Sequence, residues 1–220
     1  MEFTIIPGSA VLQAGFYGMA AVIVVAASLL VKRVRFTVAA VAWVAGVSAA
    51  SYAGLFMPRG GPPVFALLVV AVIVLGITLA RSKSGDTLSR LPLAVLVGFQ
   101  GFRLPLELLM HRAYREGLMP VQMSYSGRNF DIVTGATALI LAIALALGRV
   151  PKRLVQAWNV MGVLLLANIV GVAILSTPAF AYFGPDRLNV WVMWMPYTLL
   201  PAVMVLAAWA GHLIVFRALR

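Results

Sequence analysis

Five polar residues recur at intervals of three or four within an otherwise apolar stretch: Gln100, Arg103, Glu107, His111 and Tyr114. At roughly 100° per residue, these intervals place all five side chains on one stripe of a helix. Ionisable side chains are costly in hydrocarbon, which offers no water to solvate them, and normally face a bundle interior or a wet cavity. The stripe therefore predicts a site on this helix, without naming its chemistry.

Several kinds of chemistry are open to this stripe. Arg103 and Glu107 are four residues apart, so they could form an intrahelical ion pair, or Arg103 could hold an anionic group with its fork of donors. A desolvated Glu107 could act as an acid or base, or couple protonation to movement. Glu107 and His111 share a face, and Asp131 could add a third metal ligand, although one histidine with two carboxylates is a weak metal pattern. We expect neither a metal nor another cofactor.

The connection after the stripe, residues 111–129, is the longest in the chain and is rich in polar residues. A loop of this kind is more often functional than a simple tether. Asn129 or Asp131 would also cap the helix that follows by accepting its first free amides. We expect the ligand-binding residues to lie on the stripe and at the end of this loop: Gln100, Arg103, Glu107, His111, Tyr114, Arg128, Asn129 and Asp131.

This loop ends in a distinctive string, Gln122-Met123-Ser124-Tyr125-Ser126-Gly127-Arg128-Asn129-Phe130-Asp131. Related positions are Phe102-Arg103, Glu107, Trp158-Asn159, Ser176-Thr177-Pro178, Leu200-Pro201 and His212. This pattern, over about the second half of the chain, resembles a family of uncharacterised bacterial multi-pass inner-membrane proteins. The resemblance implies a location in the bacterial inner (cytoplasmic) membrane and adds no mechanism.

The composition indicates that the stripe lies in a membrane. Of 220 residues, 63% are hydrophobic and only 10% are charged, with a mean hydropathy of +1.02, whereas soluble domains have about 25% charged residues. The lipid bilayer is therefore the expected partner. The net charge of +11 does not predict a nucleic-acid partner, because the basic residues form short clusters between apolar runs. The absence of cysteine excludes disulfides, thiolate metal sites and cysteine nucleophiles.

Apolar runs long enough to cross a bilayer predict an all-α integral membrane bundle of seven transmembrane helices, forming a single domain over residues 1–220. The predicted spans are at about residues 8–31, 36–57, 63–80, 91–110, 130–148, 154–176 and 190–216. We expect the first span to be retained rather than cleaved as a signal peptide, because no Lys or Arg precedes residue 32. Prolines at 105, 196 and 201 predict bends in spans four and seven.

Basic residues are unequally divided between the two sides of this topology. One side has eleven, at Lys32, Arg33, Arg35, Arg81, Lys83, Arg90, Arg149, Lys152, Arg153, Arg217 and Arg220. The other has five, at Arg59, Arg112, Arg115, Arg128 and Arg187. Because positively charged loops resist translocation, we expect the N-terminus outside and the C-terminus in the cytoplasm. Trp191, Trp194 and Tyr197 then read as an aromatic belt at the outer membrane interface, and His212 and Trp209 as interface residues.

The first functional hypothesis is an outward-facing polar pocket on the fourth helix that binds or transports a small polar or anionic solute. Glu107 or His111 could link occupancy of this pocket to protonation. One alternative is an intramembrane enzyme acting on a lipid or peptide, with Glu107, His111 and Asp131 as acid, base or metal ligands. Another is a structural subunit of a membrane complex, in which the stripe only packs helices. The oligomeric state is left open.

Overall fold

The structure is a computed structural model that describes residues 7–58, 64–148 and 150–220. Helices account for 76% of the structure, and the described ranges contain no strand, as the predicted all-α class requires. The predicted start of the third span at residue 63, and Arg59 and Arg149 of the charge count, lie outside the described residues.

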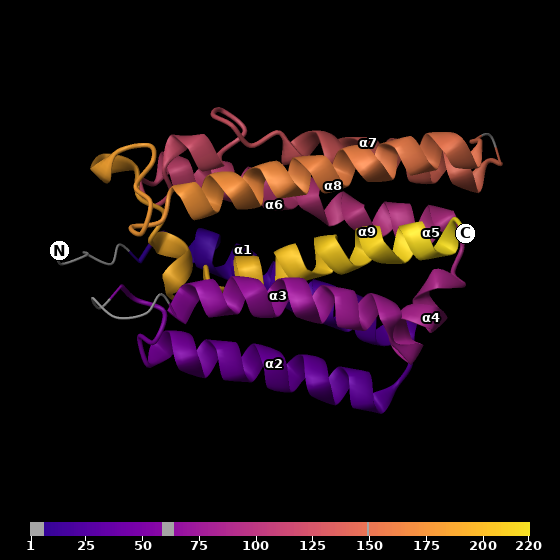
Figure 1. The fold of residues 1–220 in the computed structure, drawn as a ribbon, viewed down its shortest axis with the longest axis horizontal. Coiled ribbons are helices and arrows are strands. Elements are labelled where there is room, and N and C mark those ends of the chain that lie inside the picture. Colours follow the sequence, from indigo (N-terminus) through magenta and orange to yellow (C-terminus); the bar gives the residue numbers. More distant parts are fainter. Residues whose placement is uncertain (1–6, 59–63, 149) are drawn as a thin grey trace.

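The helices lie roughly side by side, and the two ends of the chain are at opposite ends of the bundle (Figure 1). In chain order the α-helices are α1 (Ala10–Val31), α2 (Val34–Tyr52), α3 (Val64–Arg81), α4 (Lys83–Ser89), α5 (Leu93–Phe99), α6 (Arg103–Arg115), α7 (Asp131–Ala146), α8 (Lys152–Leu175) and α9 (Leu206–Ala218). Single 3-10 turns lie at Gln100–Phe102, Val121–Met123, Pro185–Arg187 and Trp191–Met193, and a π-helix at Leu200–Val205. Below, the N-terminal and C-terminal ends of the bundle are named after the chain end that each contains.

Six helical segments of the described residues are long and apolar enough to cross a membrane. They are Ala10–Val31, Val34–Tyr52, Val64–Arg81, Leu93–Arg115, Lys152–Leu175 and Leu200–Ala218. The predicted fifth span corresponds to α7, which is apolar but has only 16 residues. The chain is therefore a multi-pass membrane protein, and the described residues contain six candidate spans.

The prolines disturb the helices at the expected places. Pro105 has no N–H to donate one turn back, and the 3-10 turn Gln100–Phe102 separates α5 from α6 just before it. Pro201 lies in the π-helix that precedes α9. The predicted start of the seventh span at residue 190 is wrong: the helical segment begins at Leu200. A proline disfavours helical geometry in the residue before it, which explains why the helix does not extend through Pro196.

The aromatic residues before this helix are inside the protein. Trp191 and Tyr197 are fully buried, and both meet the ring of Phe16 on α1 edge to face, with centroids 5.7 and 5.3 Å away. Trp194 is also buried. The predicted aromatic belt is therefore wrong for these three residues, because the loop that carries them folds back and packs against α1 rather than facing lipid.

Candidate functional site

The polar stripe lies where α6 and α7 approach each other very closely. A Cβ on Gly135 of α7 would lie 2.9 Å from the backbone carbon of Arg103 and from the Cα of Leu104. Only glycine permits this separation, because any side chain at position 135 would collide with the backbone of α6. The close approach places the start of α7 directly beside the polar residues of α6.

Arg103 is bound on both edges of its guanidinium group. Its Nε donates to Asp131 Oδ2 at 2.7 Å, and its Nη2 donates to Asp131 Oδ1. Its Nη1 lies 2.8 Å from His212 Nε2. Since arginine only donates, His212 Nε2 is the acceptor and the imidazole proton is on Nδ1. That nitrogen donates a hydrogen bond to Asn159 Oδ1 at 2.8 Å.

Glu107 has a different partner from the one expected. Asn129 Nδ2 donates to Glu107 Oε2 at 2.7 Å and to the Met123 carbonyl at 3.0 Å. Asn129 Oδ1 in turn accepts the backbone amide of Asp131, the first residue of α7, at 3.0 Å, whereas the N-cap residue is Phe130, which makes no side-chain cap hydrogen bond. Among the described residues no ion pair joins Arg103 to Glu107. The intrahelical pair is therefore wrong, because the interhelical carboxylate of Asp131 binds Nε and Nη2 of the guanidinium and His212 binds Nη1.

These contacts form one continuous buried network. Its six members come from α6, α7, α8, α9 and the loop before α7: Glu107, Asn129, Asp131, Arg103, His212 and Asn159. None is more than 4% exposed. A buried charge requires compensating partners, and the network supplies them from within the protein. It is a sealed helix-packing network and not the open pocket that the sequence predicted.

The other predicted site residues lie apart from this network. Gln100 is fully buried and donates to the Ala208 carbonyl at 3.1 Å. His111 Nδ1 lies 3.0 Å from Ser124 Oγ, and its ring stacks on Tyr125 with centroids 4.3 Å apart. Tyr114 is partly buried near His111, with ring centroids 5.8 Å apart. Arg128 is exposed, with its guanidinium over the ring of Phe183.

The proposed metal ligands do not converge. Within the ranges that the structure describes, no group of three His, Asp or Glu side chains could hold a metal ion. Glu107 is bound by Asn129, Asp131 is bound by Arg103, and His111 is turned toward Ser124. The alternative of a Glu107, His111 and Asp131 metal site is therefore wrong.

Two network members were not predicted as site residues. His212 is fully buried beside Arg103, rather than lying at a membrane interface, and Asn159 is fully buried beside His212. Gly162 on α8 makes room for the imidazole, because a Cβ there would lie 2.8 Å from His212 Nε2. Both residues could have been recognised in the sequence as polar residues within apolar helices, Asn159 in α8 and His212 in α9.

A large cavity lies elsewhere in the bundle, toward its C-terminal end. It has a volume of about 460 Å³ and is lined by residues of α1, α2, α3, α4, α5, α9 and the π-helix before α9. Its walls are mostly apolar and include Ile23, Ala40, Leu96, Leu206 and Ile214. The volume and apolar lining are typical of a binding site for a small molecule or a lipid tail.

The polar lining of the large cavity gathers where α2 begins and α3 ends. Arg35, Ser82 and Ser84 line it there. Arg35 has no carboxylate partner among the described residues. We call this end of the large cavity, at Arg35, Ser82 and Ser84, its mouth. An apolar cavity with a cationic mouth can accept the tail of an amphiphile and attract its anionic head.

No protein-family model, no curated protein and no solved structure matches the chain.

Proposed function

We propose that the protein binds an anionic phospholipid, with one lipid tail in the large cavity and the phosphate near Arg35. The observation that carries this proposal is the combination of a cavity of about 460 Å³, mostly apolar, with Arg35, Ser82 and Ser84 at one end. Arginine binds phosphate oxygens through two parallel hydrogen bonds and keeps its charge at any physiological pH. The proposed ligand is anionic, as in the sequence-based hypothesis, but it comes from the lipid bilayer rather than from solution.

The charge around this end of the bundle supports an anionic head. Nearby connections and helix ends carry basic residues at Lys32, Arg33, Arg35, Arg81, Lys83, Arg90 and Arg217. Asp86 is also at this end of the bundle, and its carboxylate is paired with Arg90 and Arg217. Each basic residue near a membrane surface contributes about 1 kcal/mol to attraction of anionic lipid. The mouth of the cavity therefore favours an anionic over a zwitterionic head.

The proposed topology is a single domain with seven spans, the N-terminus outside and the C-terminus in the cytoplasm of a bacterial inner membrane. In this topology α7 is the additional short crossing, and its 16 residues would extend about 24 Å at 1.5 Å per residue. Local thinning of the bilayer accommodates such a short span at modest cost. The mouth of the large cavity would then face the cytoplasmic leaflet, where loops rich in Lys and Arg are expected.

The polar stripe has a packing role in this proposal. Arg103, Asp131 and Glu107 are buried in direct contacts with other side chains, and the large cavity is lined by other residues. This observation favours the third sequence-based hypothesis for the stripe itself, which is that it holds helices together. The buried stripe therefore offers no binding position for a soluble solute in this proposal.

Binding can be tested by native mass spectrometry of the purified protein with phosphatidylglycerol and phosphatidylcholine of identical acyl chains. We expect phosphatidylglycerol to bind more tightly and Arg35→Gln to weaken its binding about fivefold, the equivalent of about 1 kcal/mol. The matched control is Arg33→Gln, which removes a neighbouring charge that does not line the cavity. Ala40→Phe should block the cavity for both lipids. Unchanged lipid binding by Ala40→Phe and Arg35→Gln would disprove the proposal.

A further inference from the structure

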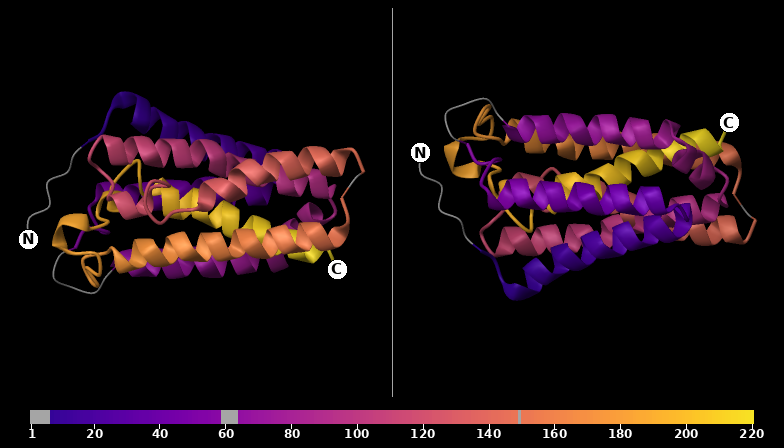
Figure 2. Two further views of the ribbon diagram at one scale, coloured as in Figure 1. Left: turned by 90° about the horizontal axis from the view of Figure 1, so that it is seen from above. Right: turned by 90° about the horizontal axis from the view of Figure 1, so that it is seen from below.

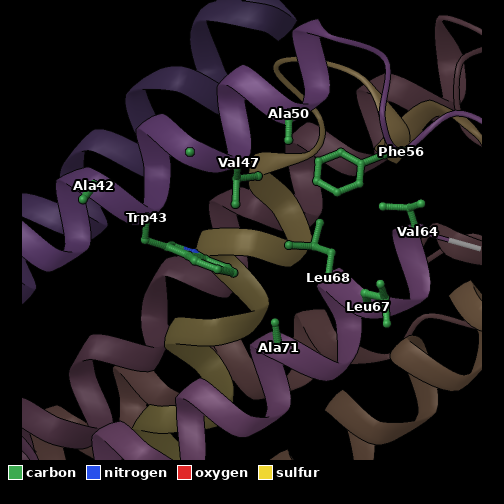
Figure 3. A pocket seen from close by; sticks show the side chains of 10 residues that line it. Ala42, Trp43, Val47, Ala50, Phe56, Val64, Leu67, Leu68 and Ala71 are labelled. Atoms are coloured by element: carbon green, nitrogen blue, oxygen red, sulfur yellow. The ribbon is translucent and has the colours of Figure 1, made fainter.

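A second cavity lies between α2 and α3, closer to the N-terminal end of the bundle (Figure 3). This side cavity has a volume of about 320 Å³, and Gly46, Ala50, Phe56, Leu67 and Leu68 are among the residues that line it. Leu67 is 66% exposed, so the side cavity adjoins the lipid-facing surface. Its lining is apolar, as a lipid tail requires.

The two cavities follow each other along the same pair of helices. On α3, the large cavity is lined by Leu75, Thr78 and Leu79, and the side cavity by residues from Val64 to Ala71. From Val64 to Leu79 a helix rises about 22 Å at 1.5 Å per residue, which is most of a hydrocarbon core of about 30 Å. Together the cavities therefore cover most of the depth of a bilayer.

Trp43 of α2 stands at the junction, because it is the residue that lines both cavities. Figure 3 shows its indole between Ala42 and Val47 of α2 and Ala71 of α3. The indole Nε1 donates to the Ala202 carbonyl at 2.9 Å. Ala202 belongs to the π-helix Leu200–Val205 and also lines the large cavity. One hydrogen bond to an irregular helix therefore holds the side chain that lines both cavities, and π-helical turns often occur at functional sites.

We propose that Trp43 is a gate on a lipid path along α2 and α3, through which the protein moves anionic phospholipid between the two leaflets. This inference rests on the proposed lipid binding and adds movement to it. The lipid tail lies in the large cavity when the gate is closed. Displacement of the indole from Ala202 joins the two cavities, and the lipid then passes into the side cavity and from there into the opposite leaflet.

Gly46 provides a way to block the path without disturbing the fold. A Cβ at Gly46 would meet no atom within 4 Å, yet this residue lines the side cavity. A leucine side chain can therefore extend into that cavity. Gly18 on α1 is the matched control, since a Cβ there also meets nothing within 4 Å and the residue lines neither cavity.

The test is transbilayer movement of fluorescent phosphatidylglycerol in reconstituted vesicles, measured by its accessibility to an impermeant quencher. We expect the wild-type protein and Gly18→Leu to accelerate movement equally over protein-free vesicles. Gly46→Leu should reduce the rate to the protein-free level, whereas Trp43→Ala should exceed the wild-type rate. Native mass spectrometry of the same Gly46→Leu protein should show unchanged phosphatidylglycerol binding in the large cavity.

The two proposals fail in distinguishable ways. Lipid binding without accelerated movement in the wild type would overturn the gate and leave the proposed function intact. The gate would also be overturned if the wild type moved lipid but Gly46→Leu and Trp43→Ala moved it at the same rate. An absence of lipid binding by the wild-type protein would overturn both.

Discussion

Arg103 and Asp131 form a two-pronged ion pair between α6 and α7, although 28 positions separate them in the chain. Both residues are buried. Removing one partner of such a pair leaves an uncompensated charge in the protein interior, which costs more than the pair itself contributes. The stability of the bundle should therefore depend on both residues being present or both being replaced.

Asp131→Asn is expected to lower the free energy of unfolding by about 3–5 kcal/mol, because the Arg103 charge loses its counterion. Asparagine keeps the shape of the side chain, so the effect isolates the charge. The measurement is thermal or denaturant unfolding of the protein in a mild detergent. The double variant Arg103→Gln with Asp131→Asn should lose less than the sum of the two single variants. Additive losses would show that the pair is not energetically coupled.

Gly162→Ala is expected to destabilise the protein by about 1–3 kcal/mol through overpacking. The new methyl group would lie 2.8 Å from His212 Nε2 and force the imidazole away from Arg103 and Asn159. The same helix has a matched control in Gly171→Ala, where a Cβ meets nothing within 4 Å. That variant should be neutral or stabilising by up to about 1 kcal/mol, since alanine favours helix more than glycine does. Equal unfolding curves for the two variants would contradict the close packing of His212.

Most of the fold could be predicted from the sequence because hydropathy and chain breaks are local properties. The prolines also predicted where regular α-helix is interrupted. A 3-10 turn precedes Pro105, and a π-helix contains Pro201. The hydrogen bond from the Asp131 amide to Asn129 Oδ1 was predictable for the same reason, since the two residues are neighbours in the chain. Helix α7 (Asp131–Ala146) is shorter than the span predicted at about residues 130–148, so it is not among the six segments long enough to cross a membrane.

The partners within the buried network could not be predicted in the same way. The spacing of Arg103 and Glu107 suggested a local pair, but the Asp131 carboxylate on the adjacent helix binds two nitrogens of the guanidinium side by side. His212 was interpreted as an interface residue because it is near the end of a span, whereas Gly162 opposite it permits complete burial. The large cavity had no sequence signal, since its walls are ordinary alanine and leucine residues from several helices.

Helix α1 lies beside α6 in the views from above and below the bundle (Figure 2). Ser9, which precedes α1, and Glu116, which follows α6, join the two segments. Glu116 accepts the Ser9 amide at 2.7 Å, the Ser9 hydroxyl at 2.6 Å and Arg112 Nε at 2.7 Å. Partial burial raises the pKa of Glu116, but these hydrogen bonds and the Arg112 charge outweigh it and hold the pKa below its ordinary value of 4.5.

This clasp should make stability depend on pH in the acid range. Because the folded pKa of Glu116 is depressed, its contribution is complete above the unfolded value of about 4.5 and is lost as the pH falls through the lower folded value. The partly exposed pair limits the contribution to about 1 kcal/mol. Tm measured from pH 7 to pH 3 should fall more in the wild type than in Glu116→Gln, which lacks the titrating group. Parallel Tm curves for the two proteins would exclude a role for this clasp.

The proposed seven-span topology predicts that the two ends of α7 are on opposite sides of the membrane. The natural chain has no cysteine, so single cysteines can be introduced without a background signal. Ser126→Cys lies in the exposed part of the loop before α7, and Arg153→Cys lies on the exposed start of α8. In intact cells, an impermeant maleimide should label the cysteine at 126 directly and the one at 153 only after permeabilisation.

The same experiment separates this topology from a bundle of six crossings. If the short helix α7 lay within one leaflet, both cysteines would react from the same side, because α7 is the helix that separates them. A cysteine at Arg220, which is exposed at the end of the chain, then completes the test: with seven crossings it is labelled together with position 153, after permeabilisation. If position 153 were labelled in intact cells and position 126 only after permeabilisation, the mouth of the large cavity, which lies at the same end of the bundle as position 153, would be in the outer leaflet. The predicted direction of lipid entry would then be reversed, since Arg35 would meet anionic heads from outside the cell.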